Sequence, residues 1–436
     1  MKKYKAYKDS GIEWIGVIPE HWNLKPLKHI VECNSESLPE NTPKNQLINY
    51  IEIGDVSAGQ GITGFEKYEF EKAPSRARRI VREGDVIIST VRTYLKAIAS
   101  IERQFDNYVV STGFAVLTPK QFDSTYLNNI VLSNGFIGEI ISLSKGVSYP
   151  SITSSDLLQI KVPFPSTLEQ EDIGAYLDQK TTEIDTLITK KEQLIKLLEE
   201  ERTAMINQAV TKGLDPNVPM KDSGIDWLGE IPEHWVLVKL KYLTRIRYGL
   251  GQPPKQKEGG LPIIRATNVY RGTISEENMI YVDPDDLPLN REPILKENDI
   301  IVVRSGAYTA DSAIIEKKWE GTVTGYDLVM TPKTVNPKLL SFALLSTYML
   351  DNQLFLQRLR AAQPHLNSEE LGNTFMLLPP DFEQIDLVDF IENELLRLNE
   401  IKEKVKKEIH FLKEYKTALI SEVVTGKIDV REEVLN

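Results

Sequence analysis

KDSGIEWIGVIPEHW at residues 8–22 returns as KDSGIDWLGEIPEHW at residues 221–235, with 12 of the 15 positions identical. An internal repeat defines the folding unit before any single residue is interpreted. The repeat extends along the chain at a nearly constant offset, since Leu168–Gln170 (Leu-Glu-Gln) is matched by Phe382–Gln384 (Phe-Glu-Gln). The chain is therefore one module present in two copies, each made of a short tract, a globular body and a long polar segment.

The two bodies, residues 23–168 and 236–380, share little beyond their apolar pattern. Each is long enough to bury a core of its own, so the 436 residues accommodate two modules. The short tracts and the order of the segments repeat, whereas the sequences of the two bodies differ. This combination suggests two versions of one task, such as the recognition of two different targets at a set separation.

Composition excludes several classes of protein. No run of eighteen apolar residues is present, so no transmembrane helix is expected. Residues 1–11 contain lysines without a following apolar stretch, which is unlike a secretory signal. Cys33 is the only cysteine, which excludes intrachain disulfides and cysteine-based zinc sites and fits a reducing compartment. We therefore expect a cytoplasmic protein without a membrane anchor.

Negative charge is concentrated outside the two bodies. The net charge of the chain is -11, but the bodies carry 0 and +1, whereas residues 169–212, 213–235 and 381–436 carry -4, -4 and -5. A neutral body with a basic face can bind nucleic acid inside an acidic chain, because phosphate contact depends on local clusters of Lys and Arg. Such clusters lie at 76–82 and 239–257. Any one charge run, however, is more often a solvated surface.

Short β-rich runs punctuated by Gly, Pro and Asn fill both bodies, as in Leu47–Ile53 and Ile263–Val269. They predict α+β domains with twisted, mostly antiparallel sheets. A helix is expected after the strands of each body, over Ser124–Ile141 and Pro337–Leu359.

The polar segments that follow the bodies predict two long helices with coiled-coil seams. Their apolar residues are spaced alternately by four and three, and lysines such as Lys402 and Lys416 fill the breaks. The seam residues are Ile173, Leu177, Ile184, Leu187, Leu194, Leu198 and Met205 in the first copy, and Ile391, Leu395, Leu398, Val405, Ile409, Leu412 and Leu419 in the second. A lone heptad helix often mediates homodimerisation, but two seams in one chain favour antiparallel pairing within it.

Motifs for catalysis and metal binding are missing from the sequence. Gly59–Gly64 fits GxGxxG, yet a strand-like run follows, so we expect a glycine-rich turn and not a dinucleotide site. No phosphate-binding loop, HExxH helix, Cys/His metal cluster or methyltransferase-type Asn/Asp-Pro-Pro-Tyr tetrapeptide occurs. His21 and His234 occupy equivalent positions of the repeat, which favours packing or capping. A self-contained restriction or modification enzyme is therefore disfavoured.

The ordered set of features resembles the specificity subunit of type I restriction-modification enzymes. The resemblance rests on the duplicated tract, the Pro-rich step into Leu-Glu-Gln or Phe-Glu-Gln, the heptad helix after each body, and the exits Val210–Gly213 and Val424–Gly426. It covers essentially the whole chain. It implies an α+β fold of two globular target-recognition domains with mostly antiparallel β-sheet, separated by two long antiparallel coiled-coil helices in an internal pseudo-twofold repeat.

The resemblance also implies boundaries and partners. Residues 1–168 and 213–380 would be the target-recognition domains, 169–212 the central helix and 381–436 the C-terminal helix. Each domain would read one half of an asymmetric bipartite site in double-stranded DNA, with the helices as spacer. Methyltransferase subunits would dock on the helices, and motor-nuclease subunits would join the complex. The chain itself would be noncatalytic and without a cofactor, while S-adenosylmethionine, ATP and Mg would be bound by the partner subunits.

Candidate DNA contacts are polar and aromatic residues in loops after strands, because hydrogen-bonding side chains read base edges and aromatic rings pack against bases or sugars. In the first body they are Ser89, Thr90, Arg92, Thr93, Tyr94, Lys145, Ser148 and Tyr149. In the second they are Arg265, Thr267, Asn268, Tyr270, Arg271, Arg304, Ser305, Tyr308, Gln363 and His365. Trp14 and Trp227 in the repeated tract are instead expected to be buried anchors between body and helix.

The main alternative function is a structural adaptor, whose acidic coiled coil joins protein partners without recognising DNA. Binding to random duplexes separates the two hypotheses, since phosphate contacts give a steep salt dependence and an adaptor gives none.

Overall fold

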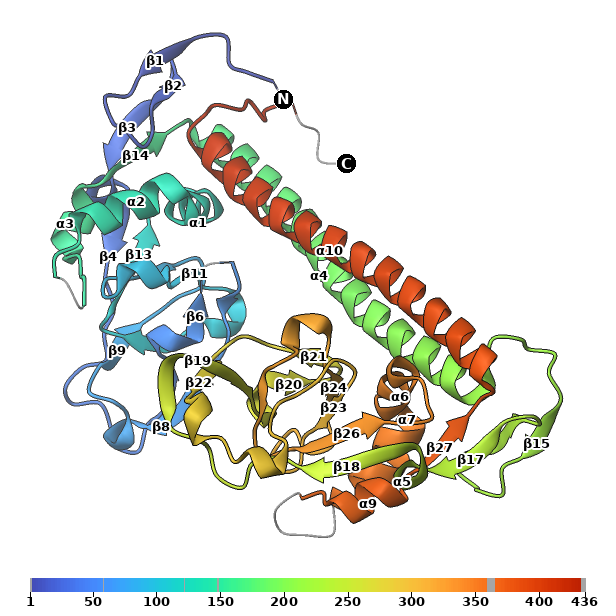
Figure 1. Cartoon of the computed structure of the whole chain (residues 1–436). Helices are drawn as coiled ribbons and strands as arrows, with labels where there is room; N and C mark the ends of the chain where they lie inside the picture. The colour runs from blue at the N-terminus through green and yellow to red at the C-terminus, as the bar shows by residue number, and fades with distance from the viewer. Residues whose placement is uncertain (1, 58, 121, 147–148, 359–364, 433–436) are drawn as a thin grey trace. The chain divides into compact units, whose positions relative to one another are not determined.

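The computed structural model describes residues 2–57, 59–120, 122–146, 149–358 and 365–432. The chain divides into two compact units, residues 1–192 with 406–436, and residues 193–405 (Figure 1). Each unit contains one repeated tract, one body, and a part of each long helix.

The repeated tract forms the same hairpin in both units. β1 (Tyr7–Asp9) pairs antiparallel with β2 (Val17–Pro19), and β15 (Met220–Asp222) pairs in the same way with β16 (Glu230–Pro232). The glycines at both ends of each connecting turn have positive φ, which glycine adopts without a steric penalty. The sequence identity of the tract is therefore an identity of local structure.

The first body is built on two four-stranded sheets with the strand orders β11-β10-β13-β4 and β8-β5-β12-β9, beside the two-stranded pairs β14-β3 and β6-β7. Its strands are β3 (Asn23–Pro26), β4 (Val31–Cys33), β5 (Leu47–Ile51), β6 (Val56–Ser57), β7 (Gly61–Ile62), β8 (Glu66–Glu69), β9 (Ala77–Ile80), β10 (Val86–Ser89), β11 (Ile98–Ser100), β12 (Val109–Ser111), β13 (Phe114–Pro119) and β14 (Lys161–Phe164). Its α-helices are α1 (Ser124–Leu132), α2 (Asn134–Leu143) and α3 (Ser154–Gln159).

The second body repeats this plan with the sheets β18-β26-β23-β24 and β22-β19-β25 and the pairs β17-β27 and β20-β21. Its strands are β17 (Val236–Lys239), β18 (Thr244–Tyr248), β19 (Gln256–Ile264), β20 (Val269–Tyr270), β21 (Thr273–Ile274), β22 (Ile280–Val282), β23 (Ile300–Val302), β24 (Ser312–Ile314), β25 (Val323–Thr324), β26 (Leu328–Pro332) and β27 (Phe375–Leu378). Its helices are α5 (Leu240–Leu243), α6 (Pro337–Leu344), α7 (Thr347–Met349), a π-helical turn (Leu350–Leu354), α8 (Phe355–Arg358) and α9 (Ser368–Asn373).

The sheets confirm the predicted fold class. Among the described residues, the parallel strand pairs are β5 with β12 and β19 with β25, and the other pairs are antiparallel. The predicted turn at Gly59–Gly64 is also confirmed, since Gly61 begins β7 of a short hairpin and Gly59 and Gly61 have positive φ.

The helices predicted over Ser124–Ile141 and Pro337–Leu359 are interrupted in the structure. In the first body Ser133 adopts an extended backbone, and its hydroxyl accepts a hydrogen bond from the Phe136 amide, which starts α2. In the second, Ser346 is extended at the equivalent break before α7. The Ser133 hydroxyl replaces a backbone acceptor at the next helix start, whereas the Ser346 hydroxyl donates to the Ala343 carbonyl of the preceding helix. Apolar periodicity alone did not reveal the breaks.

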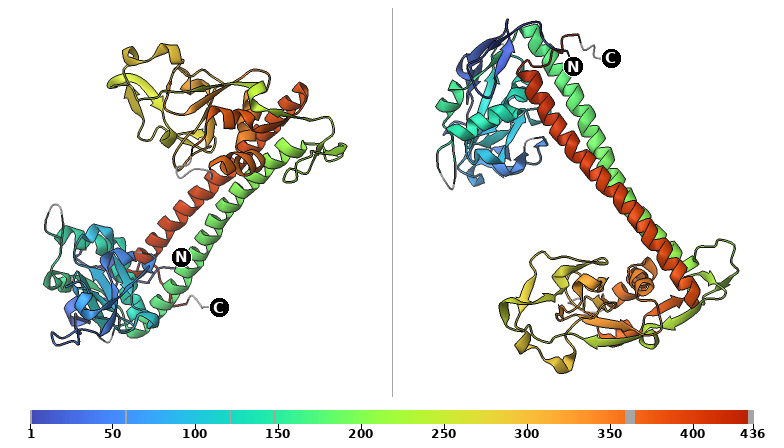
Figure 2. Two further views of the ribbon diagram at one scale, coloured as in Figure 1. Left: turned by 90° about the horizontal axis from the view of Figure 1, so that it is seen from below. Right: turned by 45° about the horizontal axis from the view of Figure 1, so that its top comes forward.

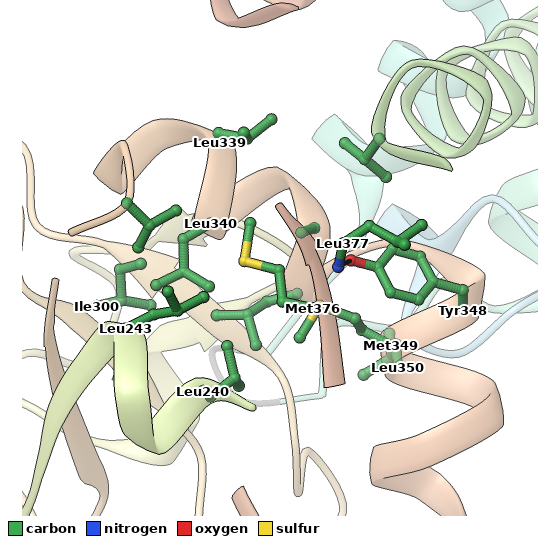
Figure 3. Close-up of a cluster of buried hydrophobic side chains, with 14 of the residues drawn as sticks. Leu240, Leu243, Ile300, Leu339, Leu340, Tyr348, Met349, Leu350, Met376 and Leu377 are labelled. Carbon is green, nitrogen blue, oxygen red and sulfur yellow. Dashed lines mark hydrogen bonds between the residues drawn. The ribbon is translucent and has the colours of Figure 1, made fainter. Parts of the chain in front are cut away.

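The second body packs its helices and sheet around one large apolar core (Figure 3). Leu240, Leu243, Ile300, Leu340 and Met376 lie in it, fully or almost fully buried. The same cluster includes the end of the first long helix at 206–210 and the start of the second at 387–391. The ends of the long helices in this unit therefore pack into the apolar core of the second body.

The two long helices are α4 (Thr167–Lys212, 46 residues) and α10 (Asp381–Val424, 44 residues). They run side by side and antiparallel in each unit (Figure 2). In the first unit Lys416 pairs with Asp185 at 2.6 Å, and in the second Arg397 pairs with Glu201 at 3.4 Å. Lys402, predicted to fill a break in the seam, also pairs across it, with Glu199.

The predicted seam is confirmed in α10 and wrong in part of α4. All nine α10 positions, seven apolar residues and two lysines, are buried or half-buried. In α4, however, Leu187 and Leu194 are 42% and 38% exposed, while Ile188 and Ile195 turn inward. A straight α-helix repeats every 3.6 residues and not every 3.5, so the inward face moves by one residue along a long seam.

The anchoring tryptophans are Trp22 and Trp235, and the expectation for Trp14 and Trp227 is wrong. Trp227 is 42% exposed, and Trp14 is half-buried against Phe136. Trp22 and Trp235 are fully buried. The hairpin explains the difference, because its turn carries the first tryptophan of each tract outward and its end brings the second into the core.

Equivalent glutamates at the starts of α4 and α10 bind these tryptophans. The Trp22 indole N–H donates to Glu169 at 3.2 Å, and that of Trp235 donates to Glu383 at 3.0 Å. His21 and His234 contact the same two carboxylates, which confirms their predicted packing role. Burial opposes ionisation of Glu169, yet the hydrogen bonds from His21 and Trp22 hold its pKa below the usual value.

Candidate nucleic-acid interface

The loop after β10 presents Arg92 in the first body. Arg92 has a left-handed backbone (φ 49°), and its amide donates to the Pro150 carbonyl at 2.8 Å. This contact joins the two loops that the sequence singled out. The Arg92 guanidinium carbon lies 4.8 Å from the centroid of the Tyr149 ring, which is 65% exposed. Arg92 and Tyr149 thus form one surface element from distant parts of the sequence.

A pocket of about 620 Å³ opens beside this pair. Arg76 and Arg92 line it together with Tyr149 and Glu52. Arginine with an aromatic ring can hold a planar base by stacking or a phosphate by charge. The sequence predicted a basic cluster that includes Arg76. It did not predict that Arg76 and Arg92 line one pocket, because this depends on how β9 and the loop after β10 are placed in the fold.

The second body carries a different element at the corresponding place. Arg304 follows β23, and its guanidinium carbon lies 4.7 Å from the Tyr248 ring centroid and 4.5 Å from that of Tyr326. Tyr248 ends β18, and Tyr326 precedes β26. Their rings are 39% and 45% exposed, so they flank Arg304 at the surface.

Close backbone approach brings the two tyrosines together. Each has a glycine neighbour, and the Gly249 amide donates to the Asp327 carbonyl at 2.9 Å. A Cβ atom on Gly249 would lie 2.2 Å from the carbonyl oxygen of Gly325, closer than any side chain allows. The glycines are therefore required for the Tyr248–Arg304–Tyr326 stack.

Asp327 lies beneath the stack and fixes its backbone. It is 2% exposed, and its Oδ1 accepts a hydrogen bond from the Arg304 amide at 3.0 Å. Burial raises the pKa of Asp327 to about 6, against the opposing effects of backbone hydrogen bonds and the charge of Arg304. The carboxyl is thus mostly ionised at neutral pH and titrates just below it.

Several other candidates are exposed near these elements. Tyr270 and Tyr308 meet edge-on with ring centroids 6.0 Å apart. His365 forms an isolated β-bridge with Ser305, directly after Arg304. Thr267, Arg271, Tyr94 and Lys145 are exposed, and Thr90 is half-buried. Ser148 and Gln363 lie outside the described residues.

Four candidates are held by internal hydrogen bonds. Ser89 is buried and donates to the Val91 carbonyl, and Thr93 is buried against the Ser144 hydroxyl. Asn268 is buried and donates to two backbone carbonyls. Arg265 is half-buried and donates to the Asn278 carbonyl at 2.7 Å. The prediction that Ser89, Thr93 and Asn268 contact DNA is therefore wrong, because a side chain closed off from solvent cannot reach a base edge. These residues shape the loops instead.

Much of the basic charge in the predicted clusters is neutralised within the protein. Arg82 pairs with Glu36, Arg245 with Glu292, and Arg247 with the buried Asp299. Sequence reasoning missed Tyr248, Tyr326 and Asp327. The only available signal was the repeated Thr-Gly-Phe/Thr-Gly-Tyr step at 112–114 and 324–326.

No group of acidic, histidine or cysteine side chains in the described part of the chain could hold a metal ion. In the same residues, no helix is both long and apolar enough to cross a membrane.

Comparison with known proteins gives the same double pattern. The family model described as "Type I restriction modification DNA specificity domain" matches residues 19–197 and again 232–410. The chain is 21% identical over 433 residues to the type I restriction enzyme EcoKI specificity subunit of Escherichia coli (strain K12), covering 95% of this chain and 90% of that protein. It is 26% identical over 320 residues to the MjaVIII specificity subunit of Methanocaldococcus jannaschii, covering 72% of each.

Solved structures share the fold. A chain from a study titled "Structural basis underlying complex assembly and conformational transition of the type I R-M system" superposes with a TM-score of 0.74 at 20% identity, covering 94% of this chain and 99% of that one. The HsdS subunit from Thermoanaerobacter tengcongensis gives 0.55 at 20% identity, covering 94% and 98%. With two bodies of one topology, two long helices and a family match in each copy, the chain belongs to the family of type I restriction-modification DNA specificity proteins.

Proposed function

We propose that this chain is the noncatalytic DNA sequence-recognition subunit of a type I restriction-modification complex in the cytoplasm. Each body reads one half of an asymmetric bipartite site in double-stranded DNA. The paired helices act as the spacer between the half-sites and as the docking surface for methyltransferase subunits.

The observation that carries this proposal is that the two bodies share a scaffold but present different residues on their exposed loops. The family match occurs once per body, and the hairpins and the four-stranded sheets β11-β10-β13-β4 and β24-β23-β26-β18 correspond. The other sheet has four strands in the first body and three in the second. The exposed loops differ, since one presents Arg92 with Tyr149 and the other presents Arg304 between Tyr248 and Tyr326. Two similar scaffolds with different contact groups suit two different half-sites. An adaptor without DNA recognition would need neither the family's specificity domains nor these arginines beside surface tyrosines.

The DNA contacts that we propose combine solvent-accessible candidates with Arg76, Tyr248 and Tyr326, which the structure adds. Arg76, Arg92 and Tyr149 serve the first half-site, and Arg304 and its tyrosines serve the second. Tyr94, Lys145 and Tyr308 follow β10, α2 and β23, and Thr267, Tyr270 and Arg271 lie in or beside β20. All six are exposed and are proposed as contacts to phosphates, sugars or base faces. Nearly neutral bodies suit this role, because the acidic charge lies mainly on the helices and on residues 213–235.

Exposed apolar side chains on the helices support docking of methyltransferase subunits. Leu168 and Phe382 occupy equivalent positions in the two copies and are both exposed, as are Leu197 and Phe411. Exposed apolar residues that recur at equivalent positions mark protein-interaction surfaces more than isolated ones do. We propose two equivalent docking surfaces, one per unit. S-adenosylmethionine would be bound by these partners, and ATP and Mg by motor-nuclease subunits.

The test is methylome sequencing of a host that expresses this chain with its methyltransferase subunit. We expect one motif with two short, different half-sites separated by unread base pairs. A continuous or palindromic motif would contradict the division of labour between the bodies. In parallel, binding of the complex to random duplexes should weaken steeply with salt, whereas an adaptor shows no such slope.

A further inference from the structure

The Arg304 guanidinium has no ion pair or hydrogen bond with any described residue. Among the described residues, none accepts a hydrogen bond from its guanidinium, and its Nε is buried without any acceptor. Arg245 and Arg247 in the same body differ, since each donates to a carboxylate, at 2.7 and 3.0 Å. Leaving a buried N–H unpaired costs free energy, and such costs are retained mainly at functional sites.

Two tyrosine rings restrict how a ligand can approach the Arg304 guanidinium. The tyrosine rings at 4.7 and 4.5 Å cover the guanidinium, and stacking on rings favours approach over its flat faces. The outer N–H groups remain, and they point in the plane of the guanidinium. A ligand that offers two acceptors in one plane fits this edge.

The stack is held rigidly from behind. The Arg304 amide donates to Asp327 at 3.0 Å, and its carbonyl accepts from Leu366 at 2.8 Å. Tyr248 is fixed as well, because the amide and hydroxyl groups of Ser368 bond to its phenolic oxygen at 3.1 and 3.0 Å. A flexible phosphate contact needs no such support, whereas base reading depends on a fixed position and plane.

The charges near Arg304 favour a guanine over a phosphate as its ligand. A phosphate and a guanine both offer two acceptors to an arginine edge. The carboxylate of Asp327 contacts the Arg304 backbone, and Glu370 also lies close enough to affect Tyr248 electrostatically. These negative charges oppose binding of a phosphate anion. The neutral edge of guanine, with O6 and N7, is not repelled.

We infer that Arg304 reads a guanine in the half-site bound by the second body, with Tyr248 and Tyr326 as positioning residues that hold its guanidinium edge toward the base. This assignment rests on the proposed function. It applies to one body only, because the equivalent place in the first body is Thr90, whose carbonyl accepts from Ile152 as that of Arg304 accepts from Leu366. The guanine contact therefore contributes to the asymmetry of the site.

The experiment uses the complex of the full chain with its methyltransferase subunits and a duplex library randomised in the second half-site. Wild-type protein should select one G·C pair by roughly tenfold or more over the other pairs. Arg304→Ala should reduce the preference at that pair to near one and keep the preferences at all others. Arg304→Lys should not restore it, because an ammonium cannot make the planar two-point contact. Arg245→Ala, which removes an exposed arginine paired with Glu292, is the matched control and should leave the motif unchanged.

The positioning role of the tyrosines is tested by substitutions that keep or remove the aromatic ring. Tyr326→Phe should keep the G·C preference, and Tyr326→Leu should lower it severalfold at that pair alone; retained preference in Tyr326→Leu would overturn the positioning role. Thermal unfolding of each variant checks that the fold is kept. Loss of affinity spread evenly over all sequences, with a salt slope lower by about one, would identify a phosphate contact and overturn the guanine assignment. Failure of the wild-type complex to select any bipartite motif would instead refute the proposed function, on which the assignment depends.

Discussion

Asp327→Asn should stabilise the second unit at neutral pH and have little effect in acid. The carboxyl is buried beneath Arg304, and burial raises its pKa from 3.8 to about 6. A raised pKa means that the folded state disfavours the ionised form. The folded protein therefore binds this proton more tightly than the unfolded chain does, and stability falls as pH rises from about 4 to about 6. Above about pH 6, the full free-energy cost of ionising the buried carboxyl lowers the stability of the fold.

The expected size follows from the same values. The interval between 3.8 and about 6 corresponds to about 3 kcal/mol at neutral pH. This value already includes the backbone hydrogen bonds from Arg304 and Ala266 and the attraction to the Arg304 charge. Asparagine therefore removes the ionisation cost, but it places an NH2 group where one carboxylate oxygen accepted a backbone hydrogen bond. We therefore expect a net gain of about 1–3 kcal/mol at pH 7.5 and no gain near pH 4.

The measurement is urea unfolding of wild type and Asp327→Asn at several pH values, followed by tryptophan fluorescence. The units contain different tryptophans, and only the transition of the unit that includes Asp327 should move. The difference between the proteins should grow between pH 4 and pH 6 and then stay constant. A difference that is independent of pH, or a variant less stable at pH 7.5, would refute the assignment of the ionisation cost to this buried carboxyl.

Four further predictions test the other parts of the molecule. Arg92→Ala should weaken recognition of the first half-site by about 1–3 kcal/mol and spare the second, and an unchanged motif in selection experiments would sink that contact. Glu169→Ala should lower stability by about 1–3 kcal/mol in thermal unfolding because it leaves a buried indole N–H unpaired, whereas Trp227→Ala should change stability by less than about 0.5 kcal/mol. Inserting seven residues at facing positions of both helices should lengthen the unread gap by about three base pairs, at 1.5 Å per residue against 3.4 Å per base pair, and an unchanged gap in the methylome would contradict the spacer role. Phe411→Asp and Leu197→Asp should each reduce binding of one methyltransferase subunit in native mass spectrometry, and full occupancy in both variants would exclude these docking surfaces.

The fold was largely predictable because most of its determinants are local or repeated. The α10 seam follows from spacing alone, and the Leu-Glu-Gln and Phe-Glu-Gln steps mark helix starts that bind the same tract in both copies. Prediction failed where the path of the backbone in the fold decides which of two similar side chains is buried. Leu187 and Ile188 are both apolar neighbours, and only the drift of a straight helix chooses which faces inward. Trp14 and Trp22 are both tryptophans of one tract, and only the hairpin turn separates them.

The sequence by itself determined that the chain is duplicated, that its bodies are α+β and its linking segments helical, and which loops diverge between the copies. Periodicity and repetition carry that information, because helices, strands and turns depend on residues close along the chain. The tertiary structure alone decided which of those loop residues are available to a ligand. It buried Ser89, Thr93 and Asn268, joined Arg92 to Tyr149, and enclosed Arg304 between Tyr248 and Tyr326. The contacts of Arg92 and Arg304 with their tyrosines join residues tens of positions apart. Side-chain packing and close glycine backbones create them only when the sheets come together.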